Sequence, residues 1–248
     1  MVKTTIITGA SRGIGAATCK LFRANGWRII GLDNHPPTHD NCDYFISCDL
    51  NVLVHEGDHV FLSEMEKIKR ELGSLEINLL VNNAATQICK NFEDLTINDF
   101  QKTFAVNLFA PFQIIKTILS EYSGHHSKII NVGSIHSTLS KSGFMAYASS
   151  KSALRSLTSS LAVELGHRAS FCLIEPAAVD TDMLSSGFPK NKDFLESLMA
   201  IHPSGSIGEP VDIAEMVLFL ASMKTNFING SVFTIDGGIR GLLPDLYF

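Results

Sequence analysis

The amino-acid sequence predicts an α/β fold, a doubly wound parallel sheet of about seven strands with helices on both faces. Short apolar runs alternate with longer stretches of helical periodicity along the 248-residue chain, a pattern typical of repeated strand–helix–strand units. The apolar runs do not alternate with polar residues, which indicates strands covered on both faces. A glycine-rich junction joins the first apolar run to the first helical stretch. We therefore expect a single α/β domain over residues 1–248.

The strands follow from short β-branched and apolar runs bounded by polar or glycine-containing segments. In chain order they are expected at Thr4–Thr8, Arg28–Asp33, Tyr44–Cys48, Ile77–Asn82, Lys128–Val132, Ser170–Glu175 and Val232–Ile235. Apolar residues with a period of 3.6 predict helices at Gly13–Asn25, Val60–Leu72, Ile97–Glu121, Ala146–Leu165 and Val211–Ala221. Only a short polar segment with two prolines links the second and third strands, so we expect a loop there in place of a crossover helix.

The composition limits the classes of partner. The net charge is −5, the pI is near 6 and no block of Lys and Arg stands out, which disfavours nucleic acid and anionic membranes as partners. No apolar run reaches the length of a membrane-spanning helix. The five cysteines are odd in number and include no C-x-x-C pair, which fits reduced thiols. We expect a cytoplasmic protein that acts on a small molecule.

The run TTIITGASRGIG places Gly9, Gly13 and Gly15 between the first strand and the first helix. Glycines allow a tight turn and a close approach to phosphate, and the helix N-terminus offers N–H groups to a pyrophosphate, as in Rossmann-type dinucleotide sites. Asp33 ends the second strand, where a carboxylate can accept hydrogen bonds from the ribose hydroxyls of NAD, although it could instead simply start a turn. Arg12 could pair with the 2′-phosphate of NADP. We favour NAD.

A strongly helical segment carries Tyr147 and Lys151 four residues apart, and therefore on one face of the helix. A phenol titrates near about 10, and a cation one turn away is expected to lower this pKa and assist proton exchange. Ser134 ends an apolar strand, at the edge of the sheet where ligands of such folds bind. An isolated Y-x-x-x-K pair is usually an ordinary helix pair, so the inference depends on its combination with the glycine loop, Asp33 and Ser134.

These motifs together resemble the short-chain dehydrogenase/reductase family, and the resemblance covers nearly all of the chain. The matching segments are TGASRGIG at residues 8–15, Asp49-Leu50, NNAA at residues 82–85, Asn107, the set of Ser134, Tyr147 and Lys151, EPAAVDT at residues 175–181 and IDGG at residues 235–238. The resemblance implies hydride transfer between nicotinamide and a secondary alcohol or carbonyl. Ala85 and Ala177 stand where the family has glycine, and each adds a methyl group that strains the backbone only at positive φ.

The resemblance also implies a role for each matched residue. Tyr147 would be the acid/base, Ser134 would bind the reacting oxygen, Lys151 would hold the nicotinamide ribose, and Asn107 would support a proton-relay water through its backbone. The cofactor would contact residues of all the matched segments, namely Gly9, Ser11, Arg12, Gly13, Ile14, Gly15, Asp33, Asp49, Leu50, Asn83, Ala84, Ala85, Tyr147, Lys151, Pro176, Val179 and Thr181. The substrate would lie under a lid around residues 183–203 and contact Gln87, Ser134, His136, Phe144, Tyr147 and Phe188. A homotetramer or homodimer is expected, because the family usually forms tetramers.

The function expected from the sequence is that of an NAD-dependent oxidoreductase, with small cyclic alcohols or dihydrodiols as candidate substrates. The alternatives are an NADPH-dependent ketone reductase and a nucleotide-binding regulator without turnover. For His136, a substrate-binding role and a plain loop role both remain open.

The run HEGDH at residues 55–59 matches the zinc-binding pattern H-E-x-x-H. Gly57 and Asp58 are poor residues for the middle of a helix and suit the start of one. A zinc site also needs a third ligand, for which the sequence offers no clear candidate. We therefore expect no metal.

Overall fold

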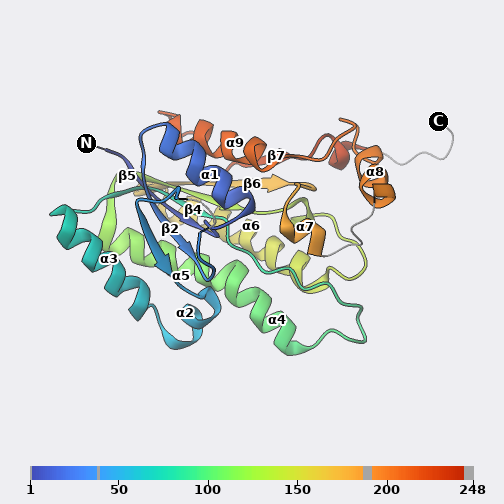
Figure 1. Ribbon diagram of the computed structural model, residues 1–248, viewed down its shortest axis with the longest axis horizontal. Helices are drawn as coiled ribbons and strands as arrows, with labels where there is room; N and C mark the ends of the chain where they lie inside the picture. The colour runs from blue at the N-terminus through green and yellow to red at the C-terminus, as the bar shows by residue number, and fades with distance from the viewer. Residues whose placement is uncertain (1, 38–39, 187–191, 243–248) are drawn as a thin grey trace.

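The computed structural model describes residues 2–37, 40–186 and 192–242. Seven strands form a parallel sheet in the order β3-β2-β1-β4-β5-β6-β7 (Figure 1). Their bounds are β1 (Thr4–Thr8), β2 (Arg28–Asp33), β3 (Tyr44–Ser47), β4 (Ile77–Asn82), β5 (Ser123–Val132), β6 (Ala169–Pro176) and β7 (Val232–Ile235). The predicted doubly wound parallel sheet is confirmed. The strand order reverses between β1 and β4, and ligands of such sheets bind beside this reversal, at the carboxyl ends of the strands.

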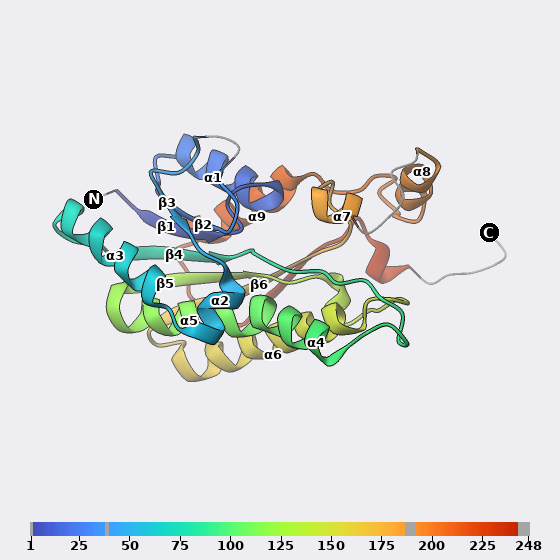
Figure 2. The ribbon, with the colours of Figure 1, turned by 60° about the horizontal axis from the view of Figure 1, so that its bottom comes forward.

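Helices cover both faces of the sheet (Figure 2). On one face, α1 (Gly13–Ala24) and α9 (Pro210–Ser222) pack against each other. The other face carries α2 (Leu50–Glu56), α3 (His59–Leu72), α4 (Ile97–Phe104), α5 (Ala110–Thr117) and α6 (Met145–Leu165). Each face has its own apolar core, with Phe22 and Val217 in the first and Phe61 and Ile114 in the second. Burial on both sides explains why the strand sequences are continuously apolar.

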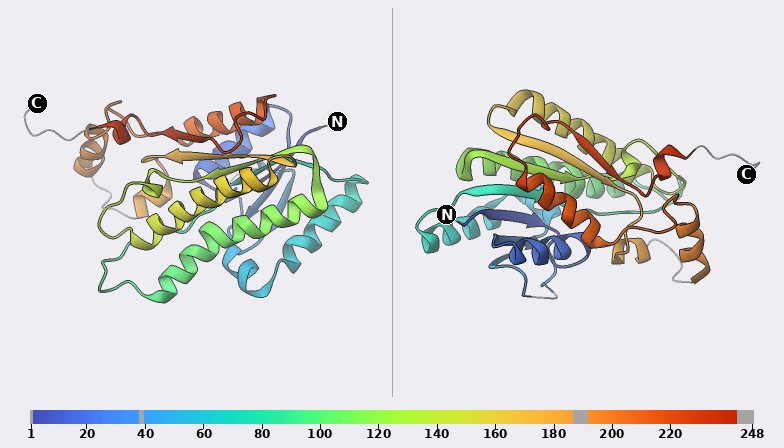
Figure 3. Two further views of the ribbon diagram at one scale, coloured as in Figure 1. Left: turned by 180° about the vertical axis from the view of Figure 1, so that it is seen from behind. Right: turned by 90° about the horizontal axis from the view of Figure 1, so that it is seen from above.

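The helix predicted at Ile97–Glu121 runs without a break from Ile97 to Tyr122. It contains two π-helical turns, η1 (Ala105–Phe109) and η2 (Ile118–Tyr122), which the apolar periodicity did not indicate. Figure 3 shows this helix in green beside α6 in yellow, and α4 contacts α6. The helix is long and apolar enough to cross a membrane, but 61% of its most apolar stretch is buried inside the protein, as in a core helix.

The connection between β2 and β3 has no helix in its described residues, 34–37 and 40–43. Cys42 from this connection packs beside Gly31 of β2, where an added Cβ would lie 2.5 Å from the Cys42 sulfur. The Cys42 and Cys19 sulfurs are 3.8 Å apart. A loop residue therefore fills the space over Gly31, and both cysteines are free thiols.

The HEGDH run does not form one helix. α2 ends at Glu56, Gly57 adopts a φ of 91°, and α3 begins at His59. His55 and His59 therefore lie on two different helices, which removes the one-turn spacing on which the H-E-x-x-H pattern depends. Asp58 precedes α3, as expected for the start of a helix, and its carboxylate accepts hydrogen bonds from Gln113 and Thr117 of α5.

Candidate active site

A cavity of about 870 Å³ lies at the carboxyl ends of the strands, on both sides of the β1–β4 reversal. Most of the residues predicted for the site line it: Gly9, Arg12, Gly13, Ile14, Asp33, Asp49, Leu50, Asn83, Ala84, Ala85, Gln87, Ser134, His136, Phe144, Tyr147, Lys151, Pro176, Val179 and Thr181. Ser11, Gly15 and Asn107 are buried behind this lining. Phe188 lies outside the described residues. The sequence motifs, which are far apart in the chain, therefore meet around one cavity.

The glycine loop brings the N-terminus of α1 to the cavity. Gly9 and Gly13 have positive φ values of 69° and 54°, which favour glycine. A Cβ on Gly15 would lie 1.9 Å from the carbonyl oxygen of Gly9, so only glycine allows α1 to approach β1 this closely. No acidic residue occupies the first turn of α1. The N–H groups and the partial positive charge of this helix end suit the binding of a pyrophosphate.

Asp33 is held by the glycine loop and by its own turn. Its carboxylate accepts hydrogen bonds from the N–H of Ser11 at 3.1 Å and from the N–H of His35 at 2.9 Å. Ser11 in turn donates its hydroxyl to the carbonyl of His35 at 2.6 Å. Asp33 thus does start a turn, yet its carboxylate also borders the cavity, and each oxygen can accept a further hydrogen bond. Arg12 borders the same cavity and is exposed.

The loop after β4 is fastened to β1 and to the helices behind it. Thr8 Oγ1 accepts hydrogen bonds from the N–H groups of Asn83 and Ala84, both at 3.0 Å. Asn107 Oδ1 accepts from the N–H of Thr86 at 2.7 Å, and its Nδ2 donates to the Thr86 carbonyl and to Ser150 Oγ, both at 2.9 Å. The Asn107 side chain therefore ties this loop to α6, while its backbone lies within the π turn η1. Its predicted support of a relay water remains a prediction.

Ser134, Tyr147 and Lys151 form one wall of the cavity. Tyr147 and Lys151 lie one turn apart on α6 and are buried, and Lys151 is only 2% exposed. The Lys151 ammonium donates to the carbonyl of Val132 at 2.8 Å and lies 5.7 Å from the centre of the Tyr147 ring. Ser134 is hydrogen-bonded to Tyr147 and comes from the loop that follows β5.

Burial has a larger effect on these two side chains than their mutual contact. It raises the pKa of Tyr147 to about 12, against a lowering by the hydrogen bond with Ser134, and it lowers the pKa of Lys151 to about 8. The expectation that Lys151 lowers the Tyr147 pKa is therefore wrong for this state of the protein. The ammonium is directed at the Val132 carbonyl, so it does not offset the desolvation of the phenol.

A buried carboxylate that the sequence analysis did not single out supports the wall from behind. Glu175 of β6 is fully buried and accepts hydrogen bonds from Arg155 of α6 at 2.7 Å, from Arg240 at 2.6 Å and from Ser137. Arg240 lies in the short 3-10 helix η4 (Ile239–Gly241), and Ser137 is the last residue of the 3-10 helix η3 (Ile135–Ser137). One carboxylate therefore fixes α6, the segment after Ser134 and the end of the described chain. The only signal in the sequence is an acid inside the apolar run SFCLIEP.

The substrate end of the cavity contains side chains from three separate segments. His136 and Phe144 line it, as predicted, with their ring centres 4.7 Å apart, and Gln87 lines it from the loop after β4. Lys141, which the sequence analysis missed, also lines the cavity. The predicted lid region contains α7 (Asp182–Ser186) and α8 (Lys192–Ala200), and its apolar residues Met183, Leu184, Leu198 and Ile201 line the cavity as well.

Comparison with known proteins agrees with this arrangement. A family model described as enoyl-(acyl carrier protein) reductase matches residues 9–240, which is most of the chain. The chain belongs to the short-chain dehydrogenase/reductase family. Protein FixR of Bradyrhizobium diazoefficiens is 34% identical over 95% of this chain and 86% of its own length. Carbonyl reductase [NADPH] 2 of Sus scrofa is 32% identical over 94% of each chain.

The solved structures show the same fold. The structure of 4-hydroxyisoleucine dehydrogenase complexed with NADH has a TM-score of 0.86 and 27% identity, and the match covers 97% of this chain and 100% of that one. The short-chain dehydrogenase/reductase relatives are oxidoreductases that use NAD(P), and the glycine loop, the α1 N-terminus and the adjoining cavity of this chain fit such a cofactor.

Proposed function

We propose that this chain is an NAD-dependent oxidoreductase that transfers a hydride between nicotinamide and a secondary alcohol or carbonyl of a small molecule. The observation that carries the proposal is a single cavity with a dinucleotide cradle at one end and Ser134, Tyr147 and Lys151 in its wall. The bound cofactor supplies the hydride acceptor or donor. The glycine loop would hold its pyrophosphate, Asp33 its adenosine ribose, Lys151 its nicotinamide ribose and Thr181 its carboxamide.

The side chains of the wall handle the proton and the oxygen of the substrate. In alcohol oxidation the substrate carbon loses a hydride, and its hydroxyl proton passes to the Tyr147 phenolate. In carbonyl reduction the Tyr147 phenol gives that proton to the oxygen. The Ser134 hydroxyl holds the same oxygen and also lowers the Tyr147 pKa. With a pKa of about 12 before the cofactor binds, Tyr147 is protonated at neutral pH and suited to the reductive direction.

The choice between the two cofactors is part of the proposal. Asp33 supports NAD, because its carboxylate borders the cavity and would repel a 2′-phosphate. Arg12 supports the alternative, an NADPH-dependent ketone reductase, because it borders the same region and could pair with that phosphate. The relatives include a carbonyl reductase named for NADPH and a dehydrogenase solved with NADH. We favour NAD, because the carboxylate is fixed in place by two backbone N–H groups.

The proposal also includes the organisation of the chain. We infer a single domain over residues 1–248, in which α7 and α8 close over the substrate as a lid. Apolar residues of both helices line the cavity, which supports this role. A homotetramer or homodimer and a cytoplasmic location remain predictions.

The proposal is tested by cofactor binding and turnover in wild-type protein and in the variant Tyr147→Phe. An active oxidoreductase reduces NAD with a secondary alcohol, whereas Tyr147→Phe binds NADH but does not turn over. Wild-type protein that binds NADH and yet shows no turnover with secondary alcohols, or with ketones and NADPH, would instead favour the non-catalytic nucleotide-binding regulator.

A further inference from the structure

Two basic side chains lie at the substrate end of the cavity, and the reaction chemistry leaves both without a role. His136 and Lys141 come from the loop between Ser134 and Tyr147, and both line the cavity. The Lys141 ammonium lies 4.3 Å from the centre of the Phe144 ring, and the His136 ring is 4.7 Å from the same ring. One aromatic ring therefore positions both basic groups.

This basic pair is close to the reacting position. The His136 ring centre is 6.1 Å from that of Tyr147, and the backbone N–H of His136 donates to Ser134 Oγ at 3.1 Å. His136 Nδ1 faces the Leu139 carbonyl at 3.3 Å, which leaves the other ring nitrogen for a ligand. A group bound by the pair would thus belong to the same small molecule as the oxygen held by Ser134 and Tyr147.

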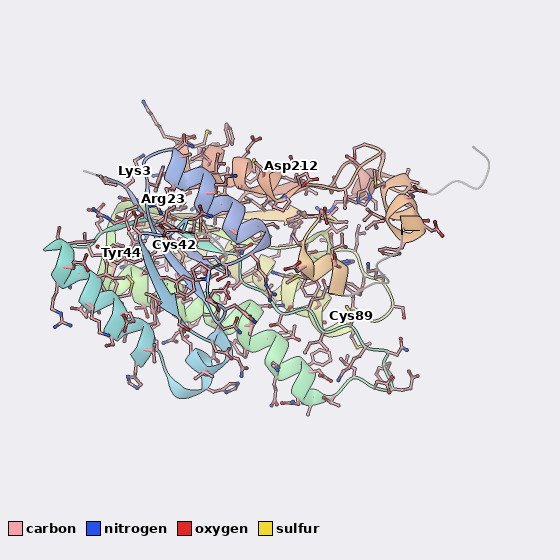
Figure 4. The ribbon with its side chains drawn as sticks, in the orientation of Figure 1. Lys3, Arg23, Cys42, Tyr44, Cys89 and Asp212 are labelled. Atoms are coloured by element: carbon pink, nitrogen blue, oxygen red, sulfur yellow. The ribbon has the colours of Figure 1, made fainter. Side chains whose placement is uncertain are left out.

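The neighbouring loop adds an amide donor. The backbone N–H of Lys90 donates to the Gly143 carbonyl at 3.1 Å, which joins the loop after β4 to the loop that carries Lys141. Gln87, on the first of these loops, lines the cavity, and burial raises the pKa of Cys89 on the same loop against a smaller lowering by the neighbouring charge of Lys141. Figure 4 places Cys89 at the same end of the molecule as α7. Gln87 and Lys141 thus line the same cavity from two loops that are joined by a backbone hydrogen bond.

The positive character of this end has a measurable consequence. The pKa of His136 is lowered, first by burial and then by the charge of Lys141, and the pKa of Lys141 is lowered by burial. The Lys141 charge thus disfavours the charged form of His136, a situation that a bound anion would reverse. The carboxylates of Asp33 and Asp49 line the cavity where β2 and β3 end, at the adenosine side. Asp182 lines it at the start of α7.

We propose that the substrate is a small hydroxy acid, or the corresponding oxo acid, whose carboxylate is bound by Lys141, His136 and Gln87 while its reacting oxygen lies at Ser134 and Tyr147. This inference rests on the proposed oxidoreductase function and names its substrate class. A carboxylate accepts hydrogen bonds only, and the ammonium of Lys141 and the amide of Gln87 can donate to it. His136 Nδ1 gives its proton to the Leu139 carbonyl, so the other ring nitrogen donates to the carboxylate only when the bound anion holds the imidazole protonated. The apolar residues of α7 and α8 then cover the carbon skeleton.

The first experiment compares acids with uncharged substrates of the same skeleton. The panel is 3-hydroxybutyrate and 3-hydroxycyclohexanecarboxylate, an open-chain and a cyclic acid, each with its methyl ester. We expect kcat/KM to be at least about tenfold higher for an acid than for its ester. In Lys141→Met the KM for the acid should rise by about tenfold or more with little change in kcat, because uniform binding is lost. Lys141→Arg should retain much of the preference.

The matched control is Lys224→Met, which removes the same charge from an exposed position after α9, away from the cavity. It should leave the acid preference unchanged. Esters that are turned over as well as acids, together with an unchanged KM in Lys141→Met, would overturn the carboxylate site and leave the proposed oxidoreductase function standing.

The second experiment reads the carboxylate site without turnover. The fluorescence of the protein–NADH complex is titrated with propionate and with methyl propionate. We expect saturable binding of propionate, weakened by about tenfold or more in Lys141→Met and unchanged in Lys224→Met, and no binding of the ester. Binding of NADH and propionate without turnover of any substrate would support the carboxylate site and contradict the proposed reaction. Failure to bind either dinucleotide would overturn the proposed function and, with it, this inference.

Discussion

The two ends of the cavity are built in different ways. The cofactor end is made largely of backbone: the positive φ of Gly9 and Gly13, the N-terminus of α1 and the ends of β1 and β4. The substrate end is made of side chains, Gln87, His136, Lys141 and Phe144, which come from two loops and meet only in the folded protein. A site made of backbone is encoded by contiguous sequence motifs, whereas a site made of side chains depends on how separate loops pack together.

Ser134, Tyr147 and Lys151 form the wall between the two ends of the cavity. Substitution of Tyr147 should have the largest effect on activity. Tyr147→Phe removes the proton-transferring hydroxyl and keeps the buried ring, so kcat should fall by roughly 10³-fold while the affinity for NADH changes little. The matched control is Tyr44→Phe, which removes the hydroxyl of an outlying tyrosine bound to Glu71. Steady-state kinetics and NADH titration measure both. A Tyr147→Phe enzyme with near-normal kcat would contradict the assigned proton transfer.

The buried ion pairs of Glu175 lie behind the substrate end. Their removal should have the second largest effect, a loss of stability. Glu175→Ala leaves Arg155 and Arg240 without the buried carboxylate that they share, and should lower the free energy of unfolding by roughly 3 kcal/mol. Glu64→Ala breaks an exposed ion pair with Lys67 and should cost less than about 1 kcal/mol. Urea denaturation measures both losses, and equal losses would mean that the Glu175 network adds nothing beyond a surface pair.

Lys151 should produce a third effect, through pH. Burial lowers its pKa from 10.5 to about 8, so between these values the unfolded chain holds a proton that the folded protein has released. Lys151 alone should therefore add about 2 kcal/mol of stability as the pH rises from about 8 to 10, whereas the thiols of Cys48 and Cys172, whose pKa values are raised by burial, act in the opposite direction. Above pH 10 the raised pKa of Tyr147 acts in the opposite direction. Denaturation at several pH values should show that the stability of wild-type protein relative to Lys151→Met increases by about 2 kcal/mol over this range; a constant difference would contradict the assignment to Lys151.

The smallest expected effect lies at the cofactor end. Asp33→Ala should weaken NADH binding by about tenfold and improve NADPH binding, because a fixed carboxylate near the 2′ position is removed. Asp40→Ala, at an exposed position on the same connection, should leave both affinities unchanged. Fluorescence titration with each dinucleotide measures the shift. An unchanged preference in Asp33→Ala would give the selection of cofactor to Arg12 instead.

The fold was predicted well from the sequence, and the residues predicted for the cofactor line one cavity, because strands, glycines and the Tyr147–Lys151 spacing are local features. The π turn around Asn107 and the network around Glu175 could not be predicted, since both depend on packing between elements that are distant in the chain. Lys141 was missed because its loop has no periodicity that would fix its direction. The Tyr147 pKa was predicted in the wrong direction, because burial is a property of the folded protein and spacing is not.

The central claim is that this cavity binds a dinucleotide and prefers NADH. Its most direct test is a titration of the purified wild-type protein with NADH and with NADPH at one fixed salt concentration, in which binding is monitored by nucleotide fluorescence. The glycine loop and the fixed Asp33 carboxylate predict saturable binding of both nucleotides at one site, with NADH the tighter ligand. Tighter binding of NADPH would make Arg12 the dominant contact and favour ketone reduction. Binding of neither would contradict the assignment of this cavity as a dinucleotide site.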